Sequence, residues 1–353
     1  MNASLVGVAG VTGRITLRQR LFASPETKQL SDVIDAGIAQ IEAGLDANLH
    51  FADALADVTG RYLLEAGGKR VRPMLTLLTA QLGQGATPEV LLAAEAIEIT
   101  HLASLYHDDV MDEAPMRRGV PSAHAVWGNS TAILTGDLLF ARASSLMSRL
   151  GERAILLQAA TFERLCLGQL HETLGPQEGE DAIEHYIQVL ADKTGSLIAA
   201  AARVGIVYSG APEEYEEAVV VFGEKIGIAF QLADDIIDLA PAKDKTGKTS
   251  GTDLRAGVPT LPTLLLERQA LTDPAAAALL LRIRNDVKAG TPEAEADFEL
   301  AVREVYAHPV TQATREEARR WAQEAVASLD ILPAGPVKQA LSAFAEHIVS
   351  RTT

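Results

Sequence analysis

The sequence predicts an all-α protein, built as a single large bundle of long helices around a central cavity. Strong helix formers such as Ala, Leu, Glu and Gln are abundant, whereas aromatic residues make up only 5% of the 353 residues. Apolar residues recur at intervals of three and four, the period of an amphipathic helix. No break in composition divides the chain, so we expect an N-terminal arm over residues 1–26 and one domain over residues 27–353.

The first four expected helices each carry a pattern, a start signal or a stop signal. Apolar side chains mark one face of the first, at positions 33, 34, 38, 41 and 45. The second ends at Gly67-Gly68, because glycine readily adopts the conformation that closes a helix. Pro73 and Pro88 suit the first turns of the third and fourth, where a backbone N–H is not needed. These helices are expected over residues 30–45, 51–64, 74–82 and 88–111.

The rest of the chain is expected to be helical around one long loop. Further helices are expected over residues 130–150, 153–174, 182–202 and 212–239. The last of these opens at Pro212, which two glutamates follow, a typical helix start. Residues 241–257 are rich in Lys, Asp, Thr and Gly and are expected to form the loop. Beyond it, helices are expected between the prolines at positions 262, 274, 292, 309 and 333.

Charge and cysteine content narrow the possible partners and the compartment. The net charge of −16 disfavours nucleic acid and anionic membrane surfaces as partners. The single cysteine, Cys166, excludes an intrachain disulfide and fits a reducing cytoplasm. It lies in an apolar stretch over residues 162–170, so we expect it to be a small core residue. The N-terminus does not resemble a signal peptide, and no run approaches about 20 apolar residues. We therefore expect a cytoplasmic protein without stable membrane insertion.

Two groups of aspartates share one spacing, and we call them the first and second aspartate clusters. Residues four apart on a helix share a face, so the outer aspartates of each cluster point the same way. Carboxylates stacked in this way repel one another, and Mg²⁺ suits their hard oxygens. One such cluster alone would fit an exposed acidic face equally well, but two beside apolar residues favour metal binding. The clusters are Asp108, Asp109 and Asp112, and Asp234, Asp235 and Asp238.

The surroundings of both clusters resemble a known family. Residues 105–112 (LYHDDVMD), followed by RRG at residues 117–119, resemble the first aspartate-rich motif of trans-isoprenyl diphosphate synthases, the polyprenyl synthetase family. Residues 230–238 (FQLADDIID) resemble the second. The resemblance runs from about residue 67 to residue 262. It implies a homodimeric prenyltransferase of the medium- or long-chain type, with three Mg²⁺ ions per active site held by the six aspartates.

The resemblance also implies which substrates bind and what reaction they undergo. An allylic primer, farnesyl or geranylgeranyl diphosphate, loses its diphosphate, and isopentenyl diphosphate attacks the resulting cation. Metal ions and protein cations stabilise the charge on the leaving group. The departing diphosphate then takes the proton, so no protein base is needed. An apolar cavity keeps water from the cation.

A basic turn at residues 67–73 (GGKRVRP) precedes the third predicted helix. Backbone amides at a helix start and flanking cations form an anion site, although basic surface turns are common. His101 lies seven residues before Asp108, close to the same helix face and about 10 Å away along the axis. A lone histidine is more often structural, but here we favour a ligand. The resemblance assigns Lys69, Arg72 and His101 to the diphosphate of isopentenyl diphosphate.

Further cations and polar residues are assigned by the resemblance alone. Arg117 is expected to face the allylic diphosphate and Arg118 the isopentenyl one. Many relatives have a lysine where this chain has Val258, which puts a contact from that position in doubt. The residues expected to contact the allylic substrate are Lys193, Thr194, Gln231 and Lys248. The residues expected to be catalytic are Asp108, Asp109, Asp112, Arg117, Lys193, Asp234, Asp235 and Lys248.

Small residues before the first aspartate cluster suggest a long product. Ser104 lies one turn below Asp108 on its own face, Ala103 flanks it, and Thr100 lies about two turns below. In the family, bulky aromatics at the positions of Ala103 and Ser104 stop growth at short products. We therefore expect a long-chain product, of the kind used for quinone side chains. Alternatively, these side chains only allow close helix packing, and another residue blocks the cavity.

Three alternatives compete with this hypothesis. A short-chain synthase making geranylgeranyl or farnesyl diphosphate would share every motif. A terpene cyclase shares the first cluster, but its second metal motif usually mixes Asn, Ser or Thr with Glu, and it has no use for a second diphosphate site. A non-catalytic subunit or prenyl-binding protein would be expected to have lost aspartates or basic residues. The sequence leaves the exact chain length, the primer, the pathway and any partner subunit undetermined.

Overall fold

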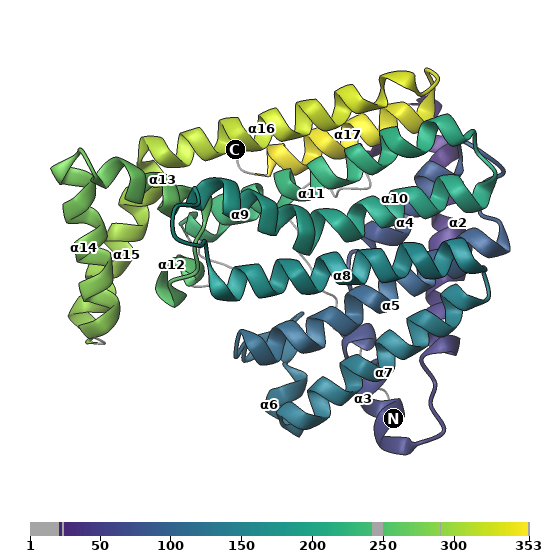
Figure 1. Ribbon diagram of the computed structural model, residues 1–353, viewed down its shortest axis with the longest axis horizontal. Helices are drawn as coiled ribbons and strands as arrows, with labels where there is room; N and C mark the ends of the chain where they lie inside the picture. The colour runs from purple at the N-terminus through teal and green to yellow at the C-terminus, as the bar shows by residue number, and fades with distance from the viewer. Residues whose placement is uncertain (1–20, 23–24, 242–249, 290, 352–353) are drawn as a thin grey trace, which may run out of the picture.

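Long helices make up nearly all the regular structure of the protein, as the computed structural model shows (Figure 1). The structure describes residues 21–22, 25–241, 250–289 and 291–351. Most of the predicted N-terminal arm and Lys248 lie outside these residues. The predicted all-α fold is confirmed.

The helices follow one another with short connections. A two-stranded antiparallel hairpin, β1 (Met116–Arg117) and β2 (Val120–Pro121), follows α5. Three short elements, η1 (Ala191–Gly195), η2 (Glu213–Tyr215) and η3 (Leu329–Ile331), are a π-helical turn and two 3-10 turns. The α-helices are α2 (Pro25–Asn48), α3 (Ala54–Glu65), α4 (Val71–Ala80), α5 (Pro88–Met111), α6 (Ala123–Trp127), α7 (Asn129–Ser148), α8 (Glu152–Leu174), α9 (Ala182–Leu190), α10 (Ser196–Ser209), α11 (Glu216–Leu239), α12 (Thr252–Ala256), α13 (Leu261–Ala270), α14 (Pro274–Ala289), α15 (Pro292–Ala307), α16 (Pro309–Ser328) and α17 (Pro336–Ser350).

Helix α10 lies at the centre of the bundle and contacts α4, α5, α8 and α11. Its run of alanines and Gly205 allow this close packing, because a methyl group at Gly205 would collide with the Thr79 hydroxyl and the α4 backbone. Thr79 and Thr76 on α4 donate hydrogen bonds to backbone carbonyls of α10. Figure 1 shows α16 and α17 along one edge, while α14 and α15 project as a hairpin from one end. A separate apolar core around Phe298 packs this hairpin against residues of α11, α13 and α16.

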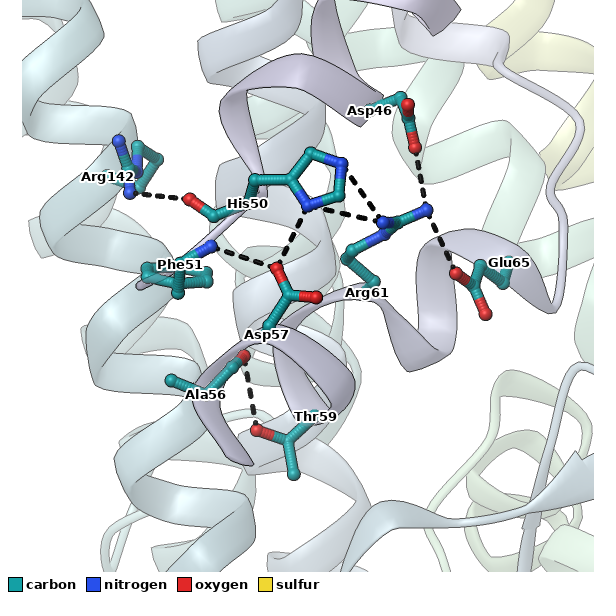
Figure 2. Close-up of polar contacts among 9 residues, drawn as sticks. All are labelled: Asp46, His50, Phe51, Ala56, Asp57, Thr59, Arg61, Glu65 and Arg142. Carbon is teal, nitrogen blue, oxygen red and sulfur yellow. Dashed lines mark hydrogen bonds and ion pairs between the residues drawn. The ribbon is translucent and has the colours of Figure 1, made fainter. Parts of the chain in front are cut away.

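The segment between α2 and α3 is held by a polar network (Figure 2). His50 Nδ1 lies 3.0 Å from Asp57 Oδ1, and Arg61 Nη2 donates to Asp46 Oδ1 at 2.8 Å. Arg142 on α7 donates to the carbonyl oxygen of His50 at 3.3 Å. Since α3 leads directly into the basic turn, these contacts fix the approach of the chain to that turn.

Most predicted helices are found, with local differences. The helix predicted over residues 51–64 starts later, at Ala54, because the Asp53 side chain accepts hydrogen bonds from the amides of Leu55 and Ala56. The helix predicted over residues 182–202 is instead two helices joined by the π-helical turn η1. The predicted loop over residues 241–257 contains the short helix α12. Nothing in the sequence pattern predicted the β1–β2 hairpin.

The prediction for Cys166 was wrong, since its side chain is exposed. Its apolar neighbours Phe162, Leu167 and Leu170 are exposed as well, so this face of α8 points away from the bundle. A run of apolar residues does not by itself distinguish a core face from a face open to solvent or to another chain. Among the described residues, no helix has the length and apolar character required to cross a membrane.

Candidate active site

The two aspartate clusters end the helices α5 and α11 and face a common space. Asp253 on α12 shows this, because carboxylates of both clusters act on it. Burial raises the pKa of Asp253 to about 6, and repulsion from Asp238, Asp234 and Asp112 acts in the same direction. Sequence reasoning missed Asp253, since its place opposite the clusters depends on how α12 folds back.

The outer aspartates of the first cluster are open to this space. Asp112 is exposed, and Asp108 is half-buried. Burial raises the pKa of Asp108 to about 6, the nearby Lys193 ammonium opposes the shift, and Asp112 reinforces it. Two crowded carboxylates that open to this space favour binding of a further cation.

The middle aspartate of the first cluster is held by an ion pair. Asp109 is fully buried, and Arg117 Nε donates to its Oδ1 at 2.6 Å. Burial raises the pKa of Asp109, and the Arg117 guanidinium opposes that shift. Its other oxygen, Oδ2, is buried without a hydrogen-bond partner among the described residues. Asp109 thus orients Arg117, which the sequence had assigned to the allylic diphosphate.

The middle aspartate of the second cluster has neutral partners instead. Tyr186 Oη on α9 donates to Asp235 Oδ2 at 2.7 Å, and the amide of Leu261, at the start of α13, donates to the same oxygen at 3.2 Å. Burial raises the pKa of Asp235 to about 7, and these hydrogen bonds oppose the shift. The carboxyl group therefore ties α9 and α13 to the end of α11.

The outer aspartates of the second cluster contact the ends of two other helices. Asp238 accepts hydrogen bonds from the amides of Thr252 and Asp253, at 3.2 and 3.1 Å, in the first turn of α12. Arg351, which follows α17, donates from Nη2 to Asp234 Oδ1 at 2.8 Å. Sequence reasoning missed Arg351, because nothing local signals that the C-terminal helix ends beside this cluster.

The π-helical turn η1 carries the predicted Lys193 and Thr194, both half-buried. Lys193 Nζ donates to the carboxylate of Glu172 on α8. Burial alone would lower the pKa of Lys193, but the carboxylates of Glu172, Asp108 and Asp112 outweigh it and raise the pKa. Lys193 therefore lies near the first cluster as a charged ammonium group. Such π turns occur frequently at functional sites.

The basic turn lines a pocket that is rich in cationic side chains. This pocket of about 440 Å³ is lined by four predicted residues, Lys69, Arg72, His101 and Arg118. Burial and the surrounding guanidinium groups hold the pKa of His101 well below its usual range, so the imidazole is neutral with one N–H to donate. The buried Nε of Arg72 has no acceptor among the described residues, which leaves a donor for an anion.

Sequence reasoning missed two further residues that line this pocket, Arg70 and Glu98. Arg70 forms an ion pair with the buried Glu98 at 3.2 Å, from Nη1 to Oε1. Arg70 and Arg118 both adopt left-handed backbone conformations, with φ of 48° and 53°. Such conformations are unfavourable for non-glycine residues and are concentrated at functional sites. Arg118 is held in place by donating to the backbone carbonyl of Leu63 at 2.7 Å.

The remaining predicted residues lie along α5 and α11. Ala103 and Thr100 are buried, and the Thr100 hydroxyl donates to Ala96 O at 2.8 Å. Ser104 is half-buried and donates to His101 O at 2.9 Å. Both hydroxyls thus bond to their own helix. Gln231 is half-buried on α11, one turn or less from the second cluster.

The clusters offer a donor set that suits a hard divalent cation. Their oxygens are carboxylate oxygens, which Mg²⁺ prefers. Within the described ranges, no group of three His, Cys, Asp or Glu side chains converges closely enough to hold an ion by itself. Mg²⁺ commonly keeps water ligands and binds phosphates of a substrate, so open carboxylates near a pocket of cationic side chains fit its chemistry.

Comparison with known proteins gives consistent matches. A family model described as "Polyprenyl synthetase" matches residues 54–297. The chain is 44% identical over 344 residues to a nonaprenyl diphosphate synthase of Mycobacterium tuberculosis, covering 97% of this chain and 98% of the relative.

Solved structures agree with these matches. The fold is similar to that of a decaprenyl diphosphate synthase from Rhodobacter capsulatus, with a TM-score of 0.81, 33% identity, and coverage of 93% of this chain and 99% of that one. It is also similar to a geranylgeranyl pyrophosphate synthase from Corynebacterium glutamicum complexed with calcium and isoprenyl diphosphate. That TM-score is 0.79, at 39% identity, with 94% of this chain and 99% of the other covered.

Proposed function

Because the chain belongs to the polyprenyl synthetase family, we propose that it is a long-chain trans-polyprenyl diphosphate synthase. It condenses an allylic diphosphate, farnesyl or geranylgeranyl diphosphate, with successive molecules of isopentenyl diphosphate. The observation that carries this proposal is the basic pocket beside two carboxylate clusters. A cyclase, which acts on one diphosphate, would have no use for that pocket.

The residues of this chain have separate tasks in the proposed reaction. Lys69, Arg72, His101 and Arg118 hold the diphosphate of isopentenyl diphosphate. Lys193 and Arg117 attract the allylic diphosphate, with Thr194, Gln231 and Lys248 as further contacts. The carbon–oxygen bond of the allylic substrate breaks, and the double bond of isopentenyl diphosphate forms the new carbon–carbon bond. The released diphosphate takes the proton.

The proposal includes Mg²⁺, with three ions per active site. Asp108, Asp112, Asp234 and Asp238 are the carboxylates best placed to hold them, since Asp109 and Asp235 are buried with protein partners. Bound Mg²⁺ would offset the negative charge that grows on the leaving diphosphate. Chelation of divalent ions should abolish turnover, and added Mg²⁺ should restore it.

We further propose that this protein forms a cytoplasmic homodimer through α7 and α8. A row of large apolar side chains on these helices is exposed in the single chain, and such a patch commonly marks an interface. Light scattering should give the mass of two chains, and Leu156→Glu should lower it. The exposed side chains are Ile133, Leu134, Leu138, Ile155, Leu156, Phe162, Leu167, Leu170 and Leu174.

One incubation tests the proposed reaction. The purified chain receives Mg²⁺, farnesyl diphosphate and isopentenyl diphosphate, and the dephosphorylated products are separated by chromatography. A ladder ending in a long prenyl alcohol supports the proposal, and a product of four units would make the chain a short-chain synthase. Diphosphate release without elongation would indicate a cyclase, and no turnover would indicate a binding protein.

The product length is tested by filling the space below the first cluster. Ala103→Phe and Ser104→Phe should shorten the product, because an aromatic ring in place of a small side chain would block the growing chain. Gln312→Ala on the exposed face of α16 is the control and should leave the product unchanged. Unchanged products from both phenylalanine variants would place the floor of the cavity elsewhere. The destination of a long product in a quinone side chain belongs to the same proposal.

A further inference from the structure

We infer that Arg164 is a positioning residue for the proposed reaction, and that it acts by fixing the π-helical turn that carries Lys193 and Thr194. This inference rests on the proposed function of those two residues. Arg164 itself lies on α8 and has no contact with either aspartate cluster among the interactions of the described residues. Its partners are the residues that shape the turn.

Arg164 joins three segments that are distant in the sequence. Its Nε donates to Asp192 Oδ1, within η1, at 2.7 Å. Its Nη2 donates to the carboxylate of Glu224 on α11. Asp192 is 8% exposed and accepts a second hydrogen bond from Gln188 at 2.8 Å. The guanidinium group is therefore the cationic partner of a buried carboxylate that belongs to the turn itself.

The turn has little room to move as long as these contacts hold. A methyl group at Gly168 on α8 would lie 2.8 Å from the amide nitrogen of Lys193. A methyl group at Gly227 on α11 would lie 2.5 Å from Cα of Gly195. The backbones of α8 and α11 thus press on the turn from two sides, and Arg164 bonds to both the turn and α11.

The spacing along α8 explains how this acts on Lys193. Arg164, Gly168 and Glu172 are four residues apart, so they form one stripe of α8 that faces the turn. Arg164 binds Asp192 at one end of the stripe, and Glu172 binds Lys193 at the other. Fixing Asp192 therefore sets the position of the next residue, whose ammonium group lies near the first aspartate cluster.

The substitution Arg164→Gln tests the inference by kinetics. It should lower kcat about 10- to 100-fold and raise KM for farnesyl diphosphate, because a displacement near 1 Å can cost that much in a preorganised site. KM for isopentenyl diphosphate should stay the same, since the basic pocket is built from other segments. Arg164→Lys, which keeps the charge, should recover part of the loss.

Arg203→Gln is the matched control. Arg203 is similarly exposed and also joins two helices, through Glu216, but it does not contact the turn. Arg203→Gln should cost less thermal stability than Arg164→Gln, because Glu216 keeps its ion pair with Arg153 whereas the buried Asp192 loses its only cationic partner among the described residues. At a temperature at which both variants are folded, only Arg164→Gln should lose activity. Equal losses of activity in the two variants, or no loss in either, would overturn the inference.

A second measurement separates this inference from the proposed function. Hydrogen–deuterium exchange of the amides in residues 191–196 should be faster in Arg164→Gln than in Arg203→Gln. Adding Asp192→Asn to Arg164→Gln should slow it again, because the unpaired buried carboxylate is gone. If the natural chain makes no prenyl product, the proposed function fails while the exchange still decides whether Arg164 fixes the turn. Unchanged exchange would refute the inference.

Discussion

Asp109 in the first aspartate cluster and Asp235 in the second occupy the same place in the same five-residue pattern, and both are buried. Their partners differ in charge. Asp109 pairs with the guanidinium of Arg117, whereas Asp235 accepts hydrogen bonds from the Tyr186 hydroxyl and the Leu261 amide. Identical sequence patterns are thus anchored by different chemistry at the ends of two helices.

The difference shows that a buried carboxylate can be compensated in two ways. A cationic partner stabilises the charged form, and removing either member leaves the other without its counter-charge. Neutral donors satisfy the oxygens but oppose the effect of burial only in part, which agrees with a pKa of about 7 for Asp235. The first arrangement should therefore be sensitive to loss of charge, and the second to loss of a hydrogen bond.

The largest expected effect concerns the outer aspartates, where the two clusters should behave alike. Asp108→Asn and Asp234→Asn should each lower kcat by about 10²- to 10³-fold, the usual cost of losing one group that stabilises developing charge. Steady-state kinetics at saturating Mg²⁺ measures this. Asp297→Asn, an exposed change on α15, is the control and should be nearly silent. If kcat fell tenfold or less for only one of the two variants, the two clusters would not contribute equally to catalysis.

The second prediction is that the middle aspartates of the two clusters differ in their contribution to stability. Asp109→Asn should lower the free energy of unfolding by about 2 kcal/mol, because it removes the charge-assisted hydrogen bond from Arg117. Asp235→Asn should cost less than about 1 kcal/mol, since an amide oxygen can still accept from Tyr186 and Leu261. Urea denaturation followed by circular dichroism measures both. Equal losses would show that the charge of the partner is unimportant.

The third prediction repeats the comparison at the other end of α5, away from the metal site. Glu98 pairs with Arg70, and Glu95 accepts a hydrogen bond from the amide of Asn48 at 2.8 Å. Burial raises the pKa of Glu95 to about 7. The folded protein therefore holds this proton more tightly than the unfolded chain does. The resulting contribution to stability is complete below about pH 4.5 and is lost as the pH rises through 7.

Replacing Glu95 with a residue that does not titrate should remove the loss of stability at high pH. Glu95→Gln should be more stable than the natural chain at pH 8 by about 2 kcal/mol, and nearly equal to it at pH 4. Glu98→Gln is the matched control and should be destabilising at pH 8, because Arg70 loses its partner. Urea midpoints at the two pH values give the answer. A Glu95→Gln variant less stable than the natural chain at pH 8 would contradict the prediction.

The sequence was sufficient for most of the helices, because these depend on local patterns, whereas the anion sites were assigned chiefly through the family resemblance. Helical periodicity is a property of neighbouring residues, and the aspartate spacing places the outer carboxylates on one face without further information. Helical arithmetic placed His101 close to the face of Asp108, whereas the grouping of His101 with the basic turn came from the family resemblance. The structure brings Lys69, Arg72, His101 and Arg118 into one pocket, as predicted.

What the sequence could not supply are contacts between distant segments. Tyr186 and Asp235 are 49 residues apart, and Lys193 and Glu172 are 21 apart, with no periodicity to link them. The π turn is likewise a result of packing against α8 and α11, since its residues alone fit an ordinary helix. The error at Cys166 has the same origin, because the orientation of α8 depends on its neighbours.

The smallest expected effect tests the neutral partner of the second cluster directly. Tyr186→Phe removes one hydrogen bond to the buried Asp235 and keeps the ring, so it should cost about 1 kcal/mol of unfolding free energy. Tyr208→Phe is the control, because the buried Tyr208 hydroxyl has no hydrogen-bond partner among the described residues, and its loss should cost nothing or stabilise slightly. In the Asp235→Asn background the cost of Tyr186→Phe should shrink, since a hydrogen bond to a neutral amide is weaker than one to a carboxylate. Additive losses in this double-mutant cycle would mean that the tyrosine acts through packing alone.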